Sequence, residues 1–291
     1  MAKFKLINNR GASLSFPDNE YCTLINIDGQ TNAVSSISSA TVGGIDGDTV
    51  NAVRANPRSI TLDFRMNSRH GVELSLREVL KVIKIKQKIT LEWTQDEMTK
   101  VIEGVVESVD MPRWNNSVIM QVTLHCEQPF WEDAQTVVQR IDEAIDLHYF
   151  TDYSNDMLYF PEEGIALGEF DTIRTKSFFN DGAVAVGLSI TINAVDKVTN
   201  PIISDAFGNF FGVGYGTDTR KVVMESGDII KITTGKGNKT VTLNGVNILD
   251  RVKPNSTWLQ LQTGENQFAI NSDDDSLTNM YFNIEYRQRY I

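Results

Sequence analysis

Val184-Ala185-Val186-Gly187-Leu188-Ser189-Ile190-Thr191-Ile192 is the stretch of sequence that decides the fold of this chain. Its aliphatic residues stand at every second position, which is the side-chain period of a β-strand with one buried face. Short runs of the same kind follow, separated by polar turns, at residues 228–234, 239–243, 257–262, 267–271 and 279–286. Asn244-Gly245, between two strand-like runs, is the strongest two-residue signal for a β-hairpin. Short strands at even spacing predict a β-sandwich over the C-terminal part of the chain.

The N-terminal part also has the pattern of strands. In residues 58–66 the apolar side chains of Ile60, Leu62, Phe64 and Met66 alternate with polar ones. Further β-prone runs occupy residues 21–28, 33–42, 86–93, 99–109 and 118–126, with turn-rich segments at residues 43–48 and 94–97. Together with the single helix described next, these runs predict a mainly β chain of the α+β class.

One helix is expected in the N-terminal part. Ser75-Leu76-Arg77-Glu78 has the spacing of a capping box, in which the Ser and Glu side chains each bond a free N–H of the first turn. Leu76, Val79, Leu80 and Ile83 then form an apolar stripe at helical spacing. We therefore expect a helix that begins at Ser75.

Four basic residues recur at helical spacing beside this stripe. Arg77, Lys81, Lys84 and Lys88 stand four, three and four residues apart, so they line one face if the helix extends that far. A solvated helix face explains such a pattern, and so does an interface with an acidic partner. We name these four residues as candidates for a protein interface.

The chain of 291 residues is long enough for two domains. Pro129-Phe130-Trp131-Glu132-Asp133 interrupts the strand pattern, so we place one domain at residues 1–133 and the other at residues 134–291. Residues 134–181 have the weakest pattern. Within them, residues 135–147 fit either an acidic helix or an irregular linker.

The charge of the chain argues against a nucleic-acid-binding function. The net charge is −11, whereas binding to phosphates requires clustered Lys and Arg. Residues 1–130 carry 14 Lys and Arg against 15 Asp and Glu, so the excess of acid lies in the rest of the chain. The two parts therefore present different surfaces to their neighbours. We expect a protein without a secretory signal or membrane span, because no apolar run is long enough.

No motif for catalysis or for a cofactor is found. His70, His125 and His148 belong to no paired metal motif, and Cys22 and Cys126 are expected to be buried reduced thiols, with a single disulfide as the alternative. The glycine-rich residues 212–216 lack the Lys-Ser/Thr of a phosphate loop. The acidic residues 273–275 lack the spaced ligands of a calcium loop, so we expect a solvated turn. We expect no cofactor, no metal and no enzymatic activity.

The order and spacing of several motifs resemble those of one known family. These motifs are Gly44-Ile45-Asp46-Gly47-Asp48, Arg54, Arg58-Ser59-Ile60-Thr61-Leu62-Asp63-Phe64, the helical stretch 76–83, Cys126-Glu127-Gln128-Pro129-Phe130-Trp131-Glu132-Asp133, Asn180-Asp181-Gly182, Asn200-Pro201, Gly227-Asp228-Ile229-Ile230-Lys231-Ile232-Thr233-Thr234, Thr240-Val241-Thr242-Leu243-Asn244-Gly245, Leu261-Gln262-Thr263-Gly264-Glu265-Asn266 and Tyr286-Arg287-Gln288-Arg289-Tyr290. The chain resembles the distal tail proteins of siphophages, a family common in phages and prophages of Gram-positive bacteria. The resemblance covers nearly the whole length and is weakest over residues 134–180.

The resemblance implies a fold and a role. It implies an N-terminal split barrel with one helix, which closes into a hexameric ring, and a C-terminal galectin-like β-sandwich. Such a ring sits at the distal end of the tail of the virion, after synthesis in the host cytoplasm. It joins the tail tube to the tail-associated hub or lysin protein, often carries receptor-binding proteins, and lets DNA pass without specific binding.

Two alternatives to this role stay open. The first is a carbohydrate-binding module, because galectin-like sandwiches include lectins. The sugar site of galectins uses a His and a stacking Trp, whereas this part of the chain has no His after His148 and has only Trp258. The second is the equivalent baseplate part of a phage-derived bacteriocin.

Overall fold

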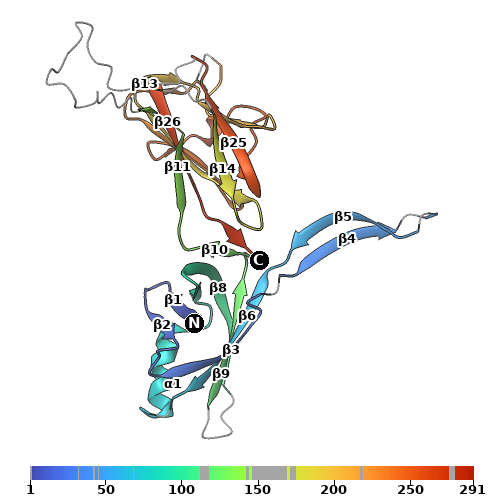
Figure 1. Cartoon of the computed structure of the whole chain (residues 1–291), viewed down its shortest axis with the longest axis vertical. Helices are drawn as coiled ribbons and strands as arrows, with labels where there is room; N and C mark the ends of the chain where they lie inside the picture. Colours follow the sequence, from blue (N-terminus) through green and yellow to red (C-terminus); the bar gives the residue numbers. More distant parts are fainter. Residues whose placement is uncertain are drawn as a thin grey trace, which may run out of the picture. The chain divides into compact units, whose positions relative to one another are not determined.

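The structure is a computed structural model that describes residues 2–31, 33–41, 43–44, 46–67, 69–111, 118–141, 144–145, 169–170, 175–216, 219–274 and 279–291. Strands dominate these residues, and α1 (Val72–Val82) is the single α-helix among them (Figure 1). The expected fold class, mainly β with one helix, is confirmed.

The chain forms two compact units. The first contains Met1–Gln135 together with the last three residues, Arg289–Ile291, and the second contains Thr136–Gln288. The sequence pattern places residues 134–291 in the second domain, whereas the last three residues lie in the first unit. They do so because Arg289 and Tyr290 pair with Glu132 and Trp131 of the segment that leaves this unit.

The first unit is built around one large antiparallel sheet. Along its main path the strands lie in the order β2, β1, β7, β8, β9, β6, β3. Their bounds are β1 (Lys3–Asn8), β2 (Ser13–Phe16), β3 (Cys22–Asp28), β6 (Arg58–Met66), β7 (Lys88–Gln95), β8 (Met98–Asp110) and β9 (Ile119–Cys126). Two short strands complete the sheet, with β10 (Trp131–Asp133) paired to both β8 and β27 (Arg289–Tyr290).

The core of this unit lies between the sheet and α1. Ile60, Leu62, Phe64 and Met66 are all buried, as the alternation of residues 58–66 predicted. The helix contributes further buried side chains to the same cluster, Leu76, Val79 and Val82, followed by Ile83. Burying each large aliphatic side chain stabilises the unit by roughly 1.5–3 kcal/mol, so the helix is held mainly by this stripe.

The expected start of the helix is wrong. The helix begins at Val72 and its N-cap residue is Gly71, so Ser75 lies one turn inside it. Ser75 is fully buried and its hydroxyl donates a hydrogen bond to the Asn67 carbonyl at 2.9 Å, which leaves no capping box. The spacing of residues 75–78 fits a capping box, but Ser75 is buried inside the helix and its hydroxyl bonds the Asn67 carbonyl instead of a backbone N–H.

The second unit contains two main sheets. One has the order β11, β26, β16, β21, β22, β23 and the other the order β14, β25, β18, β19. The bounds of the first sheet are β11 (Val137–Ile141), β16 (Ser189–Ala194), β21 (Ile229–Gly235), β22 (Asn238–Leu243), β23 (Val246–Asn247) and β26 (Met280–Tyr286). Those of the second are β14 (Thr175–Asn180), β18 (Ile202–Asp205), β19 (Phe210–Gly212) and β25 (Gly264–Asn271).

Shorter elements complete this unit. Three two-stranded pairs are β12 (Ala144–Ile145) with β13 (Glu169–Phe170), β15 (Val186–Gly187) with β24 (Gln260–Leu261), and β17 (Val198–Thr199) with β20 (Val223–Met224). A short 3₁₀ helix covers Leu249–Arg251.

The two main sheets share one hydrophobic core. Ile190 and Ile232 of the six-stranded sheet and Phe178 and Phe268 of the four-stranded sheet belong to a single buried cluster. This arrangement confirms the expected β-sandwich. The hairpin at Asn244-Gly245 is confirmed as well, since both residues have positive φ and connect β22 to β23.

The acidic helix considered for residues 135–147 is not found in the part of that segment that the structure describes. Val137–Ile141 instead forms β11, which pairs along its whole length with β26. The strand provides Ile141 to the core, and tertiary pairing therefore outweighs the weak local pattern.

Candidate functional site

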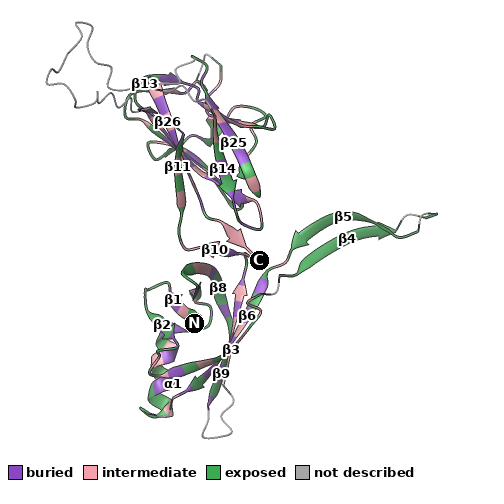
Figure 2. Ribbon diagram, viewed as in Figure 1, coloured by how far each residue is buried: buried purple, intermediate pink, exposed green. Residues whose placement is uncertain are grey.

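A hairpin of two fully exposed strands is the most unusual surface of the first unit. Every residue of β4 (Ser35–Thr41) and β5 (Asp48–Ala55) is exposed, and the two strands pair only with each other (Figure 2). We call this pair the β4–β5 arm. An isolated two-stranded hairpin is at best marginally stable in water, so an arm of this length is expected to be stabilised by a partner.

The two faces of the arm differ in chemistry. Ile37 pairs with Val53, and Ser39 pairs with Val50, so the three apolar side chains lie on one face. Ile37, Val50 and Val53 are 62%, 56% and 64% exposed. We call these three residues the apolar face of the arm.

A bulge keeps this face continuous. The register skips Asn51, because Ser38 pairs with Ala52 whereas Ser39 pairs with Val50. In a regular strand Val50 and Val53, which are three positions apart, would point to opposite faces, and the bulge at Asn51 brings them to the same face. Sequence reasoning missed the apolar face for this reason: the alternation is broken in β5 and diluted by serines in β4.

The arm leaves the sheet through a tightly packed root. The Gln30 carbonyl, before β4, accepts hydrogen bonds from Arg58 Nη1 at 2.7 Å and from Trp131 Nε1 at 2.9 Å. The backbone N–H of Asn56 donates to the Val34 carbonyl at 2.8 Å and closes the base of the hairpin. Gly29 is required here, because a Cβ on it would lie 2.1 Å from the Ser59 carbonyl oxygen.

The four basic interface candidates do not share a helical face. The helix ends at Val82, so only Arg77 and Lys81 belong to it, Lys84 follows it and Lys88 begins β7. All four are exposed. Lys81 forms an ion pair with Glu78 at 2.6 Å, and Lys88 forms one with Glu103 at 2.5 Å. Their role at an interface stays a prediction.

The cysteines are buried and not bonded to each other. Cys22 and Cys126 are both free thiols with no exposed surface. Burial raises the pKa of Cys22 to about 12 and that of Cys126 to about 11, so both stay protonated and unreactive at neutral pH. This outcome agrees with the expectation of buried reduced thiols.

The histidines and acidic side chains gather into no metal site in the described part of the chain. His70 lies against the ring of Tyr21, with 5.9 Å between ring centroids, and His125 lies on β9. His148 is outside the described residues. No helix in that same part of the chain is long and apolar enough to span a membrane.

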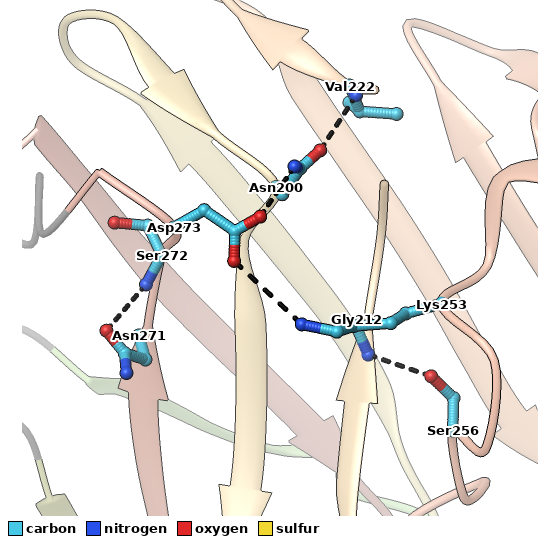
Figure 3. Close-up of polar contacts among 8 residues, drawn as sticks. All are labelled: Asn200, Gly212, Val222, Lys253, Ser256, Asn271, Ser272 and Asp273. Carbon is cyan, nitrogen blue, oxygen red and sulfur yellow. Dashed lines mark hydrogen bonds and ion pairs between the residues drawn. The ribbon is translucent and has the colours of Figure 1, made fainter. Parts of the chain in front are cut away.

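The acidic turn and the glycine-rich loop meet in a structural network of the second unit (Figure 3). Asn200 Nδ2 donates to Asp273 Oδ2 at 2.7 Å, and Asn200 Oδ1 accepts from the backbone N–H of Val222 at 2.9 Å. Lys253 Nζ lies 3.9 Å from Asp273 Oδ1. A Cβ on Gly214 would lie 2.1 Å from Asn200 Oδ1, so this glycine makes room for the network. Asp273 is therefore engaged in holding loops together.

Comparisons with known proteins agree with the fold. The family model described as "Siphovirus-type tail component, C-terminal domain" matches residues 181–290. A crystal structure of the SPP1 Dit protein, described as a paradigm of the hub adsorption apparatus in phages that infect Gram-positive bacteria, is similar with a TM-score of 0.68 and 12% identity, over 99% of each chain. A chain of the phage P2 baseplate, in its activated conformation with Ca, has a TM-score of 0.50 and 12% identity over 98% of each chain. No curated protein sequence matches this chain.

These findings define a structural protein of a phage tail. Residues 181–290 match the C-terminal domain of siphovirus-type tail components, and the resemblance to siphophage distal tail proteins is confirmed. For the first unit, the likeness to solved structures at 12% identity shows the fold.

Proposed function

We propose that this chain forms a closed, hexameric ring at the distal end of a siphophage tail. In this role it joins the tail tube to the hub protein below, provides an attachment point for receptor-binding proteins, and lets DNA pass without binding it. The fold of SPP1 Dit, a protein of a hub adsorption apparatus, supports the proposal. The role is structural and requires neither cofactor nor catalysis.

The β4–β5 arm is the observation that carries the proposal. Three large aliphatic side chains on one face of an isolated hairpin are costly to leave in water, at roughly 25 cal/mol for each Å² of apolar surface. A ring of identical subunits meets this need, because each subunit can give its arm to one neighbour and receive an arm from the other. We therefore propose that the apolar face docks on the first unit of a second copy.

The surroundings of Trp258, the only tryptophan of the second unit, argue against the sugar-binding alternative. Trp258 is partly buried against the hydrophobic core, with its ring centroid 4.8 Å from that of Phe211, and Lys239 Nζ lies 5.3 Å from the same ring. Both neighbours compete with a sugar ring for contact with the indole.

The experiment compares the two faces of the arm. The mass in solution is measured by light scattering and rings are counted in negative-stain images, for the wild type, Val53→Ser and Ala52→Ser. Val53 is on the apolar face and Ala52 is on the opposite one. Because both are exposed, neither change should shift the thermal midpoint of the monomer appreciably.

We expect rings for the wild type and for Ala52→Ser, and mainly monomers for Val53→Ser. A wild type that stays monomeric at high concentration contradicts the ring. Equal assembly of the two variants contradicts the docking of the apolar face.

A further inference from the structure

The direction of the arm depends on a small number of contacts at its root. Every residue of β4 and β5 is exposed, and both strands pair only with each other. Packing along the arm therefore contributes little to its direction. The contacts that hold the arm in place must therefore involve the residues at its two ends, which are Gln30, before β4, and Arg58, the first residue of β6.

Arg58 is buried in an unusual way for an arginine. It is only 3% exposed, and within the described part of the chain its Nε and Nη2 atoms have no hydrogen-bond partner. The hydrogen bond that its guanidinium does make there runs from Nη1 to the Gln30 carbonyl at 2.7 Å. Burial lowers the pKa of Arg58, but a guanidinium keeps its charge in proteins.

A gain in folding stability does not explain the burial of such a side chain. A buried cation with unsatisfied donors costs free energy, and an apolar residue of the same size would fill the space more favourably. The contact that Arg58 does make joins the two ends of the arm across 28 residues of sequence. This favours a role in geometry.

Trp131 brings a third segment to the same carbonyl. Its Nε1 donates to the Gln30 oxygen at 2.9 Å, and the ring is fully buried beside Trp93, with 5.7 Å between ring centroids. Gln30 is thus held by a donor from the start of β6 and by a donor from β10. Two donors on one carbonyl oxygen restrict the position of the peptide plane more than one donor does.

We propose that Arg58 is the positioning residue of the β4–β5 arm: together with Trp131 it clamps the Gln30 carbonyl and so fixes the direction in which the arm leaves the sheet. This inference adds a positioning residue to the proposed ring. It rests on the proposed function, because a fixed direction of the arm matters only if the arm docks on another copy. The clamp itself is a property of the single chain, so it can be tested without assembly.

The first experiment measures the direction of the arm directly. Spin labels are placed at Ala40→Cys on the arm and Ser15→Cys on β2, which are both exposed, whereas the buried native thiols stay unlabelled. Dilution with unlabelled protein removes distances between chains. The distance distribution is compared for the labelled chain without further change, Arg58→Met, Arg58→Lys and Arg54→Met. Arg54→Met removes the same charge from the exposed arm and is the matched control.

We expect a narrow distribution for the unchanged chain and for Arg54→Met, a clearly broader one for Arg58→Met, and an intermediate one for Arg58→Lys, which keeps a donor. Amide exchange at Asn56, whose N–H closes the base of the hairpin, should be roughly 10- to 100-fold faster in Arg58→Met, as expected for the loss of a charge-assisted hydrogen bond. If Arg58→Met does not fold, Trp131→Phe removes the other donor to Gln30 and should broaden the distribution in the same direction.

Distributions of equal width in Arg58→Met and Arg54→Met overturn the clamp. So does unchanged exchange at Asn56. If the clamp is found but the wild type forms no ring, the proposed function fails and the clamp stands. If rings form but the clamp is absent, only the inference on Arg58 fails.

Discussion

The Arg289 guanidinium donates two hydrogen bonds to Oε1 of Glu132, from Nε at 2.9 Å and from Nη2 at 2.6 Å. Glu132 lies on β10 and Arg289 on β27, so this contact joins residues 157 positions apart in the sequence. The contact therefore stabilises the packing of the last residues of the chain, which follow the second unit in the sequence, on the first unit.

We expect this pair to contribute measurably to the first unit. Arg289→Met and Glu132→Gln, alone and together, should reveal a coupling of about 1 kcal/mol, because two N–H groups bond one charged carboxylate oxygen but the side chains remain 25% and 29% exposed. The measurement is a double-mutant cycle on denaturant unfolding. Lys5, whose pair with Glu92 is longer at 4.0 Å, is the control, and an equal coupling there would contradict the special role of Arg289.

Removing the side chain of Asn200 should destabilise the second unit strongly. Asn200 is 1% exposed, has φ of 48°, and bonds both the Val222 backbone and Asp273. Asn200→Ala should lower the free energy of unfolding by roughly 2–4 kcal/mol, because it leaves the buried N–H of Val222 without an acceptor and keeps the strained φ. Asn279→Ala, which removes an exposed hydrogen bond to the Lys197 carbonyl, is the milder control. Equal losses in calorimetry would show that the network does not matter.

The second unit should fold as an isolated fragment, and its stability should depend on the two outer strands β11 and β14. Residues 136–288 contain the complete six-stranded sheet, whereas a fragment that begins at residue 182 lacks β11 and β14, an outer strand of each main sheet. We expect cooperative thermal unfolding for the longer fragment and a lower midpoint or no transition for the shorter one. Equal midpoints would mean that these strands add nothing to the sandwich.

Among the basic interface candidates, Lys84 should matter most for assembly. Lys81 and Lys88 are engaged in ion pairs, whereas no ion pair involves Lys84 within the described part of the chain. Lys84→Glu should slow ring formation or docking, and high salt should mimic this defect in the wild type, because rim charges steer association. Lys81→Glu should have a smaller effect. We also expect all four basic residues to face away from the lumen, since free cations there would bind DNA.

Because of its two buried thiols, the first unit should lose folding stability at alkaline pH. Their pKa is raised from 9.0 to about 12 for Cys22 and about 11 for Cys126, so above pH 9 the unfolded chain loses these protons before the folded chain does. The associated stability is therefore fully present below pH 9 and decreases as the pH rises toward the folded values. Denaturant unfolding between pH 8 and pH 10.5 should show this decrease, with a shallower slope for Cys126→Ala. An unchanged slope would contradict this cause.

Much of the fold could be predicted because burial follows a simple period in many strands. Residues 58–66 and 184–192 alternate cleanly, and Asn244-Gly245 has a turn geometry that few other residue pairs favour. The helix start and β11 could not be predicted, because the partner of Ser75 and the pairing of β11 with β26 are set by distant residues. The first strand of the arm and its loop lie in segments predicted as β-prone and turn-rich, whereas β5 and the apolar face escaped prediction because the Asn51 bulge changes the alternation. The Gln30 clamp escaped prediction because a backbone carbonyl leaves no trace in a sequence pattern.

The chain passes from the first unit into the second after Gln135, and it returns to the first unit at Arg289. Most domains at one end of a chain hang from a single linker, which one proteolytic cut can sever. Here a nick at residues 135–136 would leave the sandwich held by the noncovalent pairing of β27 with β10, including the contact between Arg289 and Glu132, whereas a nick before β27 would leave the covalent link at residues 135–136 intact. The strength of this short pairing therefore sets whether a chain cut once after Gln135 keeps its second unit.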